Sequence, residues 1–267
     1  MIFRFEKLAL VSIMVSVIFI TLGHTMFDAT AEAEPTHEVA QGCNRKAFVV
    51  LLDVGHTPEA PGAISARGVT EFSFNLHLST SILRRLKSRG FVNTHRLIMT
   101  GGKENLHQRS ARAQELGAKL LLSLHHDSVQ QEYLQQWQFA GEQHSFSDEF
   151  SGYSLFVSKK NPFFSLSLAF AEMLGGQLRG KGMHFSRHHA EQVDGERRTI
   201  LDPLNGIYQF DDLIVLKSAE YPAVLFEAGI IANRREELEL RRLRFRNKAA
   251  DAVTRAVEAF CSWEEIG

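Results

Sequence analysis

Apolar residues follow two patterns along this chain. Continuous apolar runs predict strands, because the strands of a parallel sheet are buried on both faces. Apolar positions that recur at helical spacing predict amphipathic helices. Strands are expected at residues 48–54, 93–99, 119–124, 154–157, 212–217 and 223–227. Helices are expected at residues 71–88, 106–116, 164–178, 233–246 and 249–263.

This alternation of strands and helices is typical of an α/β fold. It predicts a single doubly wound, largely parallel sheet flanked by helices, with right-handed crossovers. We assign residues 47–267 to one catalytic domain and residues 34–46 to a linker before it. The 44% hydrophobic and 23% charged content suits a globular protein with a full core. The formal net charge of −1 argues against broad binding to nucleic acid, which usually needs a basic excess.

The first 33 residues differ from the rest of the chain. Arg4 and Lys7 precede an uncharged apolar run at 8–22, and small residues around Ala31 follow it. This order predicts a secretory signal peptide at residues 1–33, which would contact the membrane only during export. An uncleaved membrane anchor is the alternative, because the run is only slightly shorter than a spanning helix of ~17–25 residues. We therefore expect an exported protein and, without cell-surface repeats, a periplasmic one.

The exported part contains two cysteines, Cys43 and Cys261. They lie just before the first expected strand and near the end of the last expected helix. An exported compartment permits a disulfide, and a loop this long could stabilise the fold by up to ~5 kcal/mol. The sequence leaves a disulfide and two free thiols equally open, because it does not give the distance between the two Cα atoms.

Four residues are candidates for chemistry: His56, Glu71, His125 and Glu227. Each follows an expected strand or opens an expected helix, and the carboxyl ends of strands converge in an open α/β sheet. Two neutral imidazoles and one carboxylate can hold a catalytic zinc with one position left for water. A further carboxylate nearby can accept a proton from that water. Taken singly, each residue also fits a structural role, such as a turn histidine or a first-turn acid favoured by the helix dipole.

The segments around these residues resemble the zinc-dependent N-acetylmuramoyl-L-alanine amidases, cell-wall hydrolases of the third amidase family. The resemblance extends from about residue 47 to the last helix. It departs from the family pattern at Val54, Thr57 and His126, where a proline, a glycine and a small residue are usual, and none of these removes a ligand. The similar segments are 53–56 (DVGH), 61–63 (PGA), 68–71 (GVTE) with Asn75, then Leu106, Arg109 and Ala113, 123–127 (SLHHD), and 222–229 (PAVLFEAG) followed by Asn233.

The resemblance implies a role for each candidate residue. His56, Glu71 and His125 would bind one Zn²⁺ per chain, and Glu227 would activate the water. The substrate would be peptidoglycan, cleaved at the amide between the lactyl group of N-acetylmuramic acid and L-alanine of the stem peptide. The alternatives are a zinc peptidase or amidohydrolase acting on another amide, and a non-catalytic wall-binding protein on the same scaffold.

Several neighbouring residues have open roles. Motif alignment favours His125 over His126 as the ligand, but adjacent strand residues point in opposite directions, so the choice depends on the fold. Asp127 and Asn75 could orient ligands. Arg109 could form a structural salt bridge or bind substrate. The residues His184, His188 and His189 are interpreted as a polar loop near the cleft rather than as ligands.

Residues 129–152 interrupt the path from the third expected strand to the fourth. This glutamine-rich segment follows His125 closely, so it is expected to overhang the metal. Some relatives close their site with an inserted helix that an activator protein displaces. The hypothesis is that residues 129–152 form a lid or a substrate wall on which an activator acts, with one glutamate capping the metal. The alternative is an ordinary surface loop.

Overall fold

The protein is described here from a computed structural model that covers residues 42–101 and 106–264. The predicted signal peptide and residues 34–41 of the linker lie outside the described residues. The described part belongs to one compact unit, Ala40–Gly267. Its strands are β1 (Val50–Val54), β2 (Thr94–Leu97), β3 (Leu120–Asp127), β4 (Gln135–Phe139), β5 (Glu142–Phe146), β6 (Ser154–Val157), β7 (Ile200–Asp202), β8 (Ile207–Gln209) and β9 (Ala223–Ile230). Its helices are α1 (Glu71–Ser88), α2 (Leu106–Glu115), α3 (Phe164–Gly180), α4 (Ile214–Lys217), α5 (Glu236–Leu240) and α6 (Leu243–Glu264).

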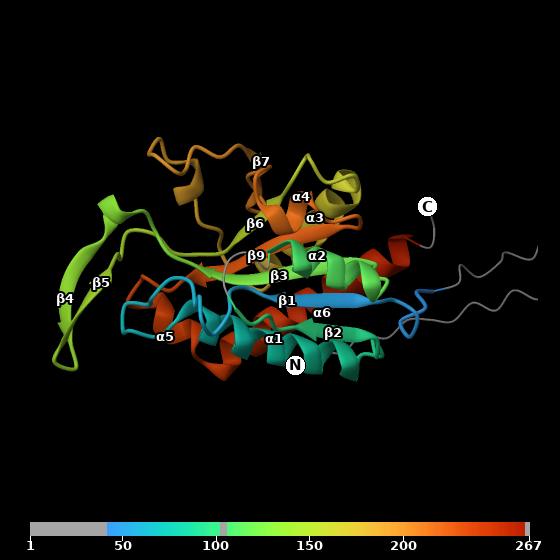
Figure 1. Cartoon of the computed structure of the whole chain (residues 1–267), viewed down its shortest axis with the longest axis horizontal. Helices are drawn as coiled ribbons and strands as arrows, with labels where there is room; N and C mark the ends of the chain where they lie inside the picture. The colour runs from blue at the N-terminus through green and yellow to red at the C-terminus, as the bar shows by residue number, and fades with distance from the viewer. Residues whose placement is uncertain (1–41, 102–105, 265–267) are drawn as a thin grey trace, which may run out of the picture. The chain divides into compact units, whose positions relative to one another are not determined.

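One mixed, mostly parallel sheet organises the fold (Figure 1). Its seven strands lie in the order β2-β1-β3-β9-β6-β8-β7. The strands β2, β1, β3 and β9 are parallel, and β6 then pairs antiparallel with β9. The expected α/β class with a largely parallel sheet flanked by helices is therefore confirmed. The separate hairpin β4–β5 extends beyond the sheet.

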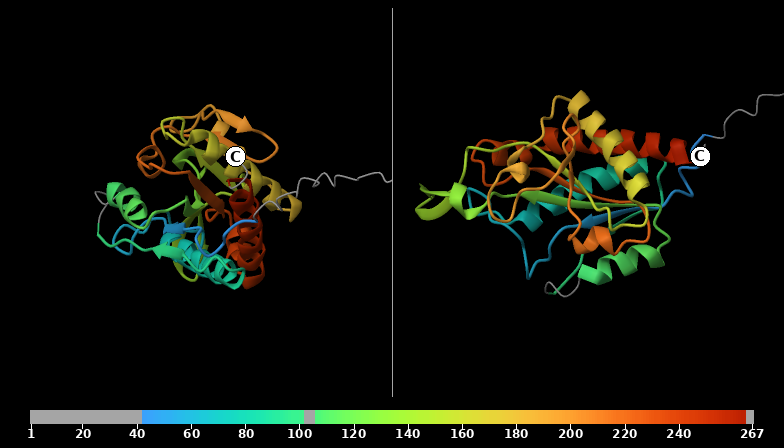
Figure 2. Two further views of the ribbon diagram at one scale, coloured as in Figure 1. Left: turned by 90° about the vertical axis from the view of Figure 1, so that its right-hand side faces the viewer. Right: turned by 90° about the horizontal axis from the view of Figure 1, so that it is seen from above.

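Helices cover both faces of the sheet. On one face, Leu52 and Leu122 pack in a core with residues of α1, α3 and α6. On the other face, Leu51 and Leu121 pack with residues of α2 and α4. Figure 2 shows α1 and α6 on the side opposite α2 and α4. Because strand side chains alternate between faces, the odd-numbered residues of β3 up to His125 face the α2–α4 side.

The predicted strand at 212–217 is wrong. This segment contains the short helix α4, which buries Val215 and Leu216 in the core beside β9. A short apolar run does not distinguish a buried strand from a buried helical turn, so its hydrophobicity was compatible with both. The strands β4, β5, β7 and β8 were not expected. Both β3 and β9 continue three residues past their expected ends. His125 therefore lies within β3 rather than after it, and Glu227 lies inside β9 rather than at its end.

A disulfide joins Cys43 to Cys261, with a Cα–Cα distance of 5.3 Å. The bond ties the segment before β1 to the end of α6 and resolves the question that the sequence left open. Cys261 is fully buried in the core between the sheet and α6. Within residues 42–101 and 106–264, no helix combines the length and apolar character needed to cross a membrane.

Candidate metal centre

Three predicted ligands come together at the carboxyl ends of the strands. His56 lies in the loop after β1, Glu71 opens α1, and His125 lies on β3. The carboxylate of Glu71 is 2.8 Å from His56 Nε2 and 2.9 Å from His125 Nδ1. One ligand atom from each of the three lies within 4.8 Å of the others. Burial acts to raise the pKa of Glu71, but hydrogen bonds from His125 and His56 lower it far below its ordinary value, which keeps the carboxylate ionised.

Two glycines leave room for this cluster. A Cβ atom on Gly55 would lie 2.4 Å from the ring of His125. A Cβ atom on Gly62 would lie 2.4 Å from Glu71 Oε2 and 2.6 Å from the ring of His56. Gly62 also has φ +78°, a backbone conformation that other residues rarely adopt. The cluster therefore fits only against backbone without side chains at these two positions.

Arg109 holds the loop that carries His56. It forms an ion pair with Asp53 and donates hydrogen bonds to the carbonyl oxygens of Val54 at 2.8 Å and His56 at 2.7 Å. Ser123 donates to the other oxygen of Asp53 at 2.7 Å. Arg109 is only 3% exposed. The structure thus favours the structural salt bridge over substrate binding.

His126 points away from the cluster. Its Nδ1 lies 2.8 Å from Asn75 Oδ1, and its ring lies against Phe74 on α1. Burial lowers the pKa of His126 to about 3, so the imidazole is neutral. Asn75 also donates to Glu71 Oε1 at 3.3 Å and so orients that carboxylate, as predicted. The strand alternation therefore places His125, and not His126, in the cluster.

Glu227 lies beside the cluster on the neighbouring strand. It pairs in register with His125 of β3 and with Ser154 of β6. Its Oε2 atom is buried and has no hydrogen-bond partner. Burial raises the pKa of Glu227 well above its ordinary value, and the negative charges of Asp127 and Glu71 raise it further. A cation nearby would oppose these effects and favour the ionised carboxylate.

The histidines at 184, 188 and 189 separate into two groups. His184 is exposed, with its Nε2 3.0 Å from Ser151 Oγ. His188 and His189 are buried and converge on Asp127. The sequence analysis interpreted these histidines as part of a polar loop near the cleft and did not predict that His188 and His189 contact Asp127. The only local indication of this contact was that Asp127 lies two residues after a predicted ligand.

The sequence profile of the N-acetylmuramoyl-L-alanine amidase family matches residues 50–259, which include His56, Glu71, His125 and Glu227. The chain belongs to this family. The amidase is therefore a hydrolase, and peptidoglycan is its substrate.

Known proteins are similar to most of this chain. A Buchnera aphidicola protein assigned as an N-acetylmuramoyl-L-alanine amidase is 22% identical over 226 residues, covering 78% of this chain and 92% of the relative. The amidase from Mycobacterium smegmatis has a TM-score of 0.60 at 20% identity and covers 82% of this chain and 98% of its own. The CwlD amidase from Clostridioides difficile, solved with the GerS lipoprotein, has a TM-score of 0.59 at 18% identity, covering 81% and 99%. At these identities the two structures show a shared fold.

Residues 129–152 of this amidase form a hairpin rather than a helix. The strands β4 and β5 pair antiparallel, and the part of 129–152 before them contains only the single 3-10 turn Gln131–Tyr133. The side chains of Glu132, Glu142 and Glu149 are exposed. The hairpin contacts the loop before α1, where Trp137 donates to the carbonyl oxygen of Ala66 at 2.8 Å. The hypothesis that a glutamate caps the metal stays a prediction, and so does the activator.

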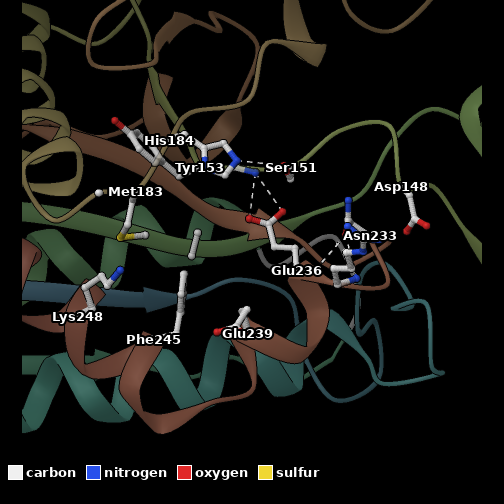
Figure 3. Close-up of a pocket in the computed structure, with 14 residues that line it drawn as sticks. Asp148, Ser151, Tyr153, Met183, His184, Asn233, Glu236, Glu239, Phe245 and Lys248 are labelled. Carbon is white, nitrogen blue, oxygen red and sulfur yellow. Dashed lines mark hydrogen bonds between the residues drawn. The ribbon is translucent and has the colours of Figure 1, made fainter.

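A cavity of about 460 Å³ lies on the face of β9 opposite to the face that carries Glu227 (Figure 3). Ala228 lines this cavity, whereas its neighbour Glu227 points to the other face. Glu236 reaches into it, and its carboxylate accepts hydrogen bonds from the backbone N–H groups of Gly152 and Ile230 at 2.9 Å. None of the residues that line this cavity belongs to the histidine–glutamate cluster.

Proposed function

We propose that this amidase cleaves the amide between the lactyl group of N-acetylmuramic acid and L-alanine of the stem peptide. In this proposal His56, Glu71 and His125 hold a Zn²⁺ ion, and Glu227 is the general base. The observation that carries the proposal is the register of β3 and β9, which sets His125 opposite Glu227. A ligand and a free carboxylate oxygen therefore stand side by side on neighbouring strands.

The donor set of the cluster fits zinc. Two imidazoles and one carboxylate are a known catalytic combination for this metal, and with a divalent ion they leave a net charge near +1. The glycine-lined space at Gly55 and Gly62 keeps the donor atoms close together. When bound, zinc supplies a Lewis acid that polarises a carbonyl and lowers the pKa of water to ~7.

Residues of the chain then position the ligands and transfer the proton. Arg109 and Asn75 fix the positions of His56 and Glu71 through the contacts described above. Glu227 takes a proton on Oε2 from the attacking water and returns it to the nitrogen of L-alanine as the C–N bond breaks. The products are a lactyl carboxylate on the glycan and a peptide with a free L-alanine amino group. Proton transfer of this kind contributes ~10²–10⁴-fold to the rate.

We further propose that the protein works after export, in the periplasm. The disulfide between Cys43 and Cys261 supports this location, because disulfides persist in oxidising compartments. A protein partner that acts on residues 129–152 belongs to the same proposal. The CwlD amidase, with the same fold, was solved with a lipoprotein bound.

Digestion of purified peptidoglycan tests the function. Wild-type protein is expected to release peptides with free L-alanine amino groups, identified by mass spectrometry after amine labelling. Glu227→Gln is expected to lower this rate ~10²–10⁴-fold while retaining zinc. Glu220→Gln, an exposed glutamate shortly before β9, is the matched control and is expected to keep the wild-type rate.

The alternatives give different results in this experiment. Hydrolysis at another amide, with no new L-alanine amino group, would support a peptidase or amidohydrolase instead. Binding to the wall without hydrolysis would support the non-catalytic protein. Full activity of Glu227→Gln would contradict the general-base role, and unchanged zinc content in His56→Ala would contradict the ligand assignment.

A further inference from the structure

A second cluster of metal-ligating side chains lies at the same edge of the sheet. It combines Asp127, the last residue of β3, with His188 and His189 from the 3-10 turn His188–Ala190. The Nε2 atoms of His188 and His189 lie 3.1 Å and 2.7 Å from Asp127 Oδ2. One ligand atom from each of the three residues lies within 4.8 Å of the others.

The converging atoms of this cluster have no hydrogen-bond partners. Asp127 Oδ2, His188 Nε2 and His189 Nε2 are all buried and make no hydrogen bond, because their close mutual contacts lack hydrogen-bond geometry. The two histidines are only 2% and 6% exposed, so their rings have little contact with bulk solvent. Buried polar atoms nearly always form hydrogen bonds, so three that lie within 4.8 Å of one another without any are typical of a site for an ion.

The other polar atoms of these three side chains already have hydrogen-bond partners. His188 Nδ1 lies 2.9 Å from Ser186 Oγ, and His189 Nδ1 lies 2.9 Å from Glu196 Oε2. Asp127 Oδ1 accepts the backbone N–H of Ser128 at 2.8 Å. Metal-binding histidines usually engage their second ring nitrogen in this way, which fixes the ring and leaves one nitrogen for the metal.

Charged neighbours complete the environment of the cluster. Glu196 forms an ion pair with Arg198 and accepts a 2.9 Å hydrogen bond from Gln130. Burial acts to lower the pKa of His189, but the carboxylates of Asp127 and Glu196 raise it to about 9, so this ring holds a proton when no metal is bound. A divalent cation would displace that proton and would balance the buried negative charge of Asp127.

We propose that Asp127, His188 and His189 form a second Zn²⁺ site, distinct from the cluster of His56, Glu71 and His125. Two imidazoles and one carboxylate are the same donor set as in the first cluster, and imidazole nitrogen favours zinc over magnesium or calcium.

This site lies on the face of the sheet that carries Glu227. The ring of His189 is 4.7 Å from Phe156, which belongs to the core on the α2–α4 side. A cation there anchors the segment after α3 to the end of β3, beside the first cluster. The proposal concerns metal content and does not depend on which amide bond is cleaved.

Zinc stoichiometry of the untagged, oxidised full chain tests the proposal. The protein is stripped with a chelator, dialysed against buffered Zn²⁺ and measured by mass spectrometry for zinc per chain. Wild type is expected to bind two, and His188→Gln and His189→Gln to bind one. His56→Ala is also expected to bind one, because it removes the other site. His184→Gln, an exposed histidine of the same segment, is the matched control and is expected to bind two.

A graded variant separates ligand loss from misfolding. Glu196→Gln keeps both imidazoles but weakens the partner of His189, so its affinity for the second zinc is expected to fall ~10–100-fold with the first site unchanged. Circular dichroism confirms that each variant is folded. One zinc in wild type, lost in His56→Ala, would overturn the proposal without any second-site variant. Two zinc ions retained in both His188→Gln and His189→Gln would overturn it as well.

Discussion

Arg109 donates a 2.7 Å hydrogen bond to the carbonyl oxygen of His56. His56 has φ 68°, an unusual conformation for a residue with a side chain. The same guanidinium binds Asp53 and the carbonyl oxygen of Val54, so one buried cation fixes the whole turn. Strained backbone persists where surrounding contacts determine it, and such positions cluster at functional sites. The position of a proposed metal ligand thus depends on a side chain from α2.

Replacing Arg109 with lysine is expected to weaken metal binding at the first cluster. Lysine offers a single ammonium group and does not reproduce the planar fork that reaches three acceptors. We expect an affinity for zinc ~10–100-fold lower, the effect typical of residues that orient ligands. Calorimetric titration of the stripped protein measures this. The control is Arg112→Lys, an exposed arginine on the same helix, and equal affinities for the two variants would contradict the positioning role.

Gly62→Ala is expected to disrupt the cluster by direct overlap. The new Cβ would lie 2.4 Å from Glu71 Oε2, closer than van der Waals contact permits. Gly117→Ala is the matched control, because Gly117 has φ +66° but a Cβ added there would meet nothing within 4 Å. Both variants carry the ~1–2 kcal/mol cost of a left-handed residue, measurable by urea unfolding. Only Gly62→Ala is expected to lose zinc as well, and equal zinc content in the two variants would contradict the steric argument.

The buried parallel strands could be predicted from the sequence because their signal is local. The strands β1, β3 and β9 are mostly apolar and almost entirely buried. His56 follows β1, His125 lies on β3 and Glu227 lies on β9. The hairpin β4–β5 carries no such signal, since its strands are polar and largely exposed. The helix α4 has an apolar run too short for its period to be read.

Those residues of the candidate site that lie in sequence motifs could be predicted from the sequence. His56, Glu71 and His125 were found because each occurs in a recognisable segment at an expected element boundary. The choice of His125 over His126 needed the fold, since it depends on which face packs against α1. The association of His188 with Asp127 arises from the path of the chain after α3, and no local pattern records it.

The stability of the fold is expected to fall between pH 4.5 and 7 because of Glu236. Burial raises the pKa of Glu236 from 4.5 to about 7, although hydrogen bonds from Ile230 and Gly152 oppose it and the charge of Asp127 adds to it. In this window the folded state keeps a proton that the unfolded state has released, so the free energy of unfolding decreases as pH rises. The full difference is ~3 kcal/mol, present below pH 4.5 and lost above pH 7.

Urea unfolding from pH 4.5 to 8 checks this contribution. Glu236→Gln is expected to have a flatter dependence than wild type over this range, because glutamine does not titrate. Glu239→Gln on the same helix is the control, since arginine side chains lower the pKa of Glu239 and keep it ionised throughout. A Glu236→Gln curve parallel to that of wild type would show that Glu236 titrates normally in the folded protein.

Removing the disulfide is expected to destabilise the protein without abolishing metal binding. Cys43 and Cys261 are 218 residues apart, so the bond constrains nearly the whole unfolded chain. Cys43→Ser combined with Cys261→Ala is expected to lose up to ~5 kcal/mol of unfolding free energy. The bond lies before β1, at the opposite end of that strand from His56. Reduced wild type serves as the control and should unfold like the variant, and an unchanged free energy would contradict the prediction.

The hairpin is expected to act as a wall for polymeric substrate. Trp137 stacks on Phe139 with ring centroids 5.4 Å apart, and the guanidinium groups of Arg67 and Arg234 each lie 5.1 Å from its ring. The contact with Arg67 joins the hairpin to the loop that leads into Glu71, and the contact with Arg234 joins it to the segment after β9. Trp137→Ala removes the anchor, so the KM for intact peptidoglycan should rise several-fold. Cleavage of a short muropeptide and zinc content should stay unchanged, because neither requires the hairpin.

Steady-state kinetics on both substrates distinguish this wall from a gate. Gln138→Ala, an exposed residue of the same strand, is the control and should match wild type. A higher basal rate of Trp137→Ala on both substrates would instead indicate a closed lid that an activator opens. Identical kinetics for Trp137→Ala, Gln138→Ala and wild type would mean that residues 129–152 form an ordinary surface loop. Because a wall changes KM for the polymer alone and a lid changes kcat for both substrates, one data set decides between them.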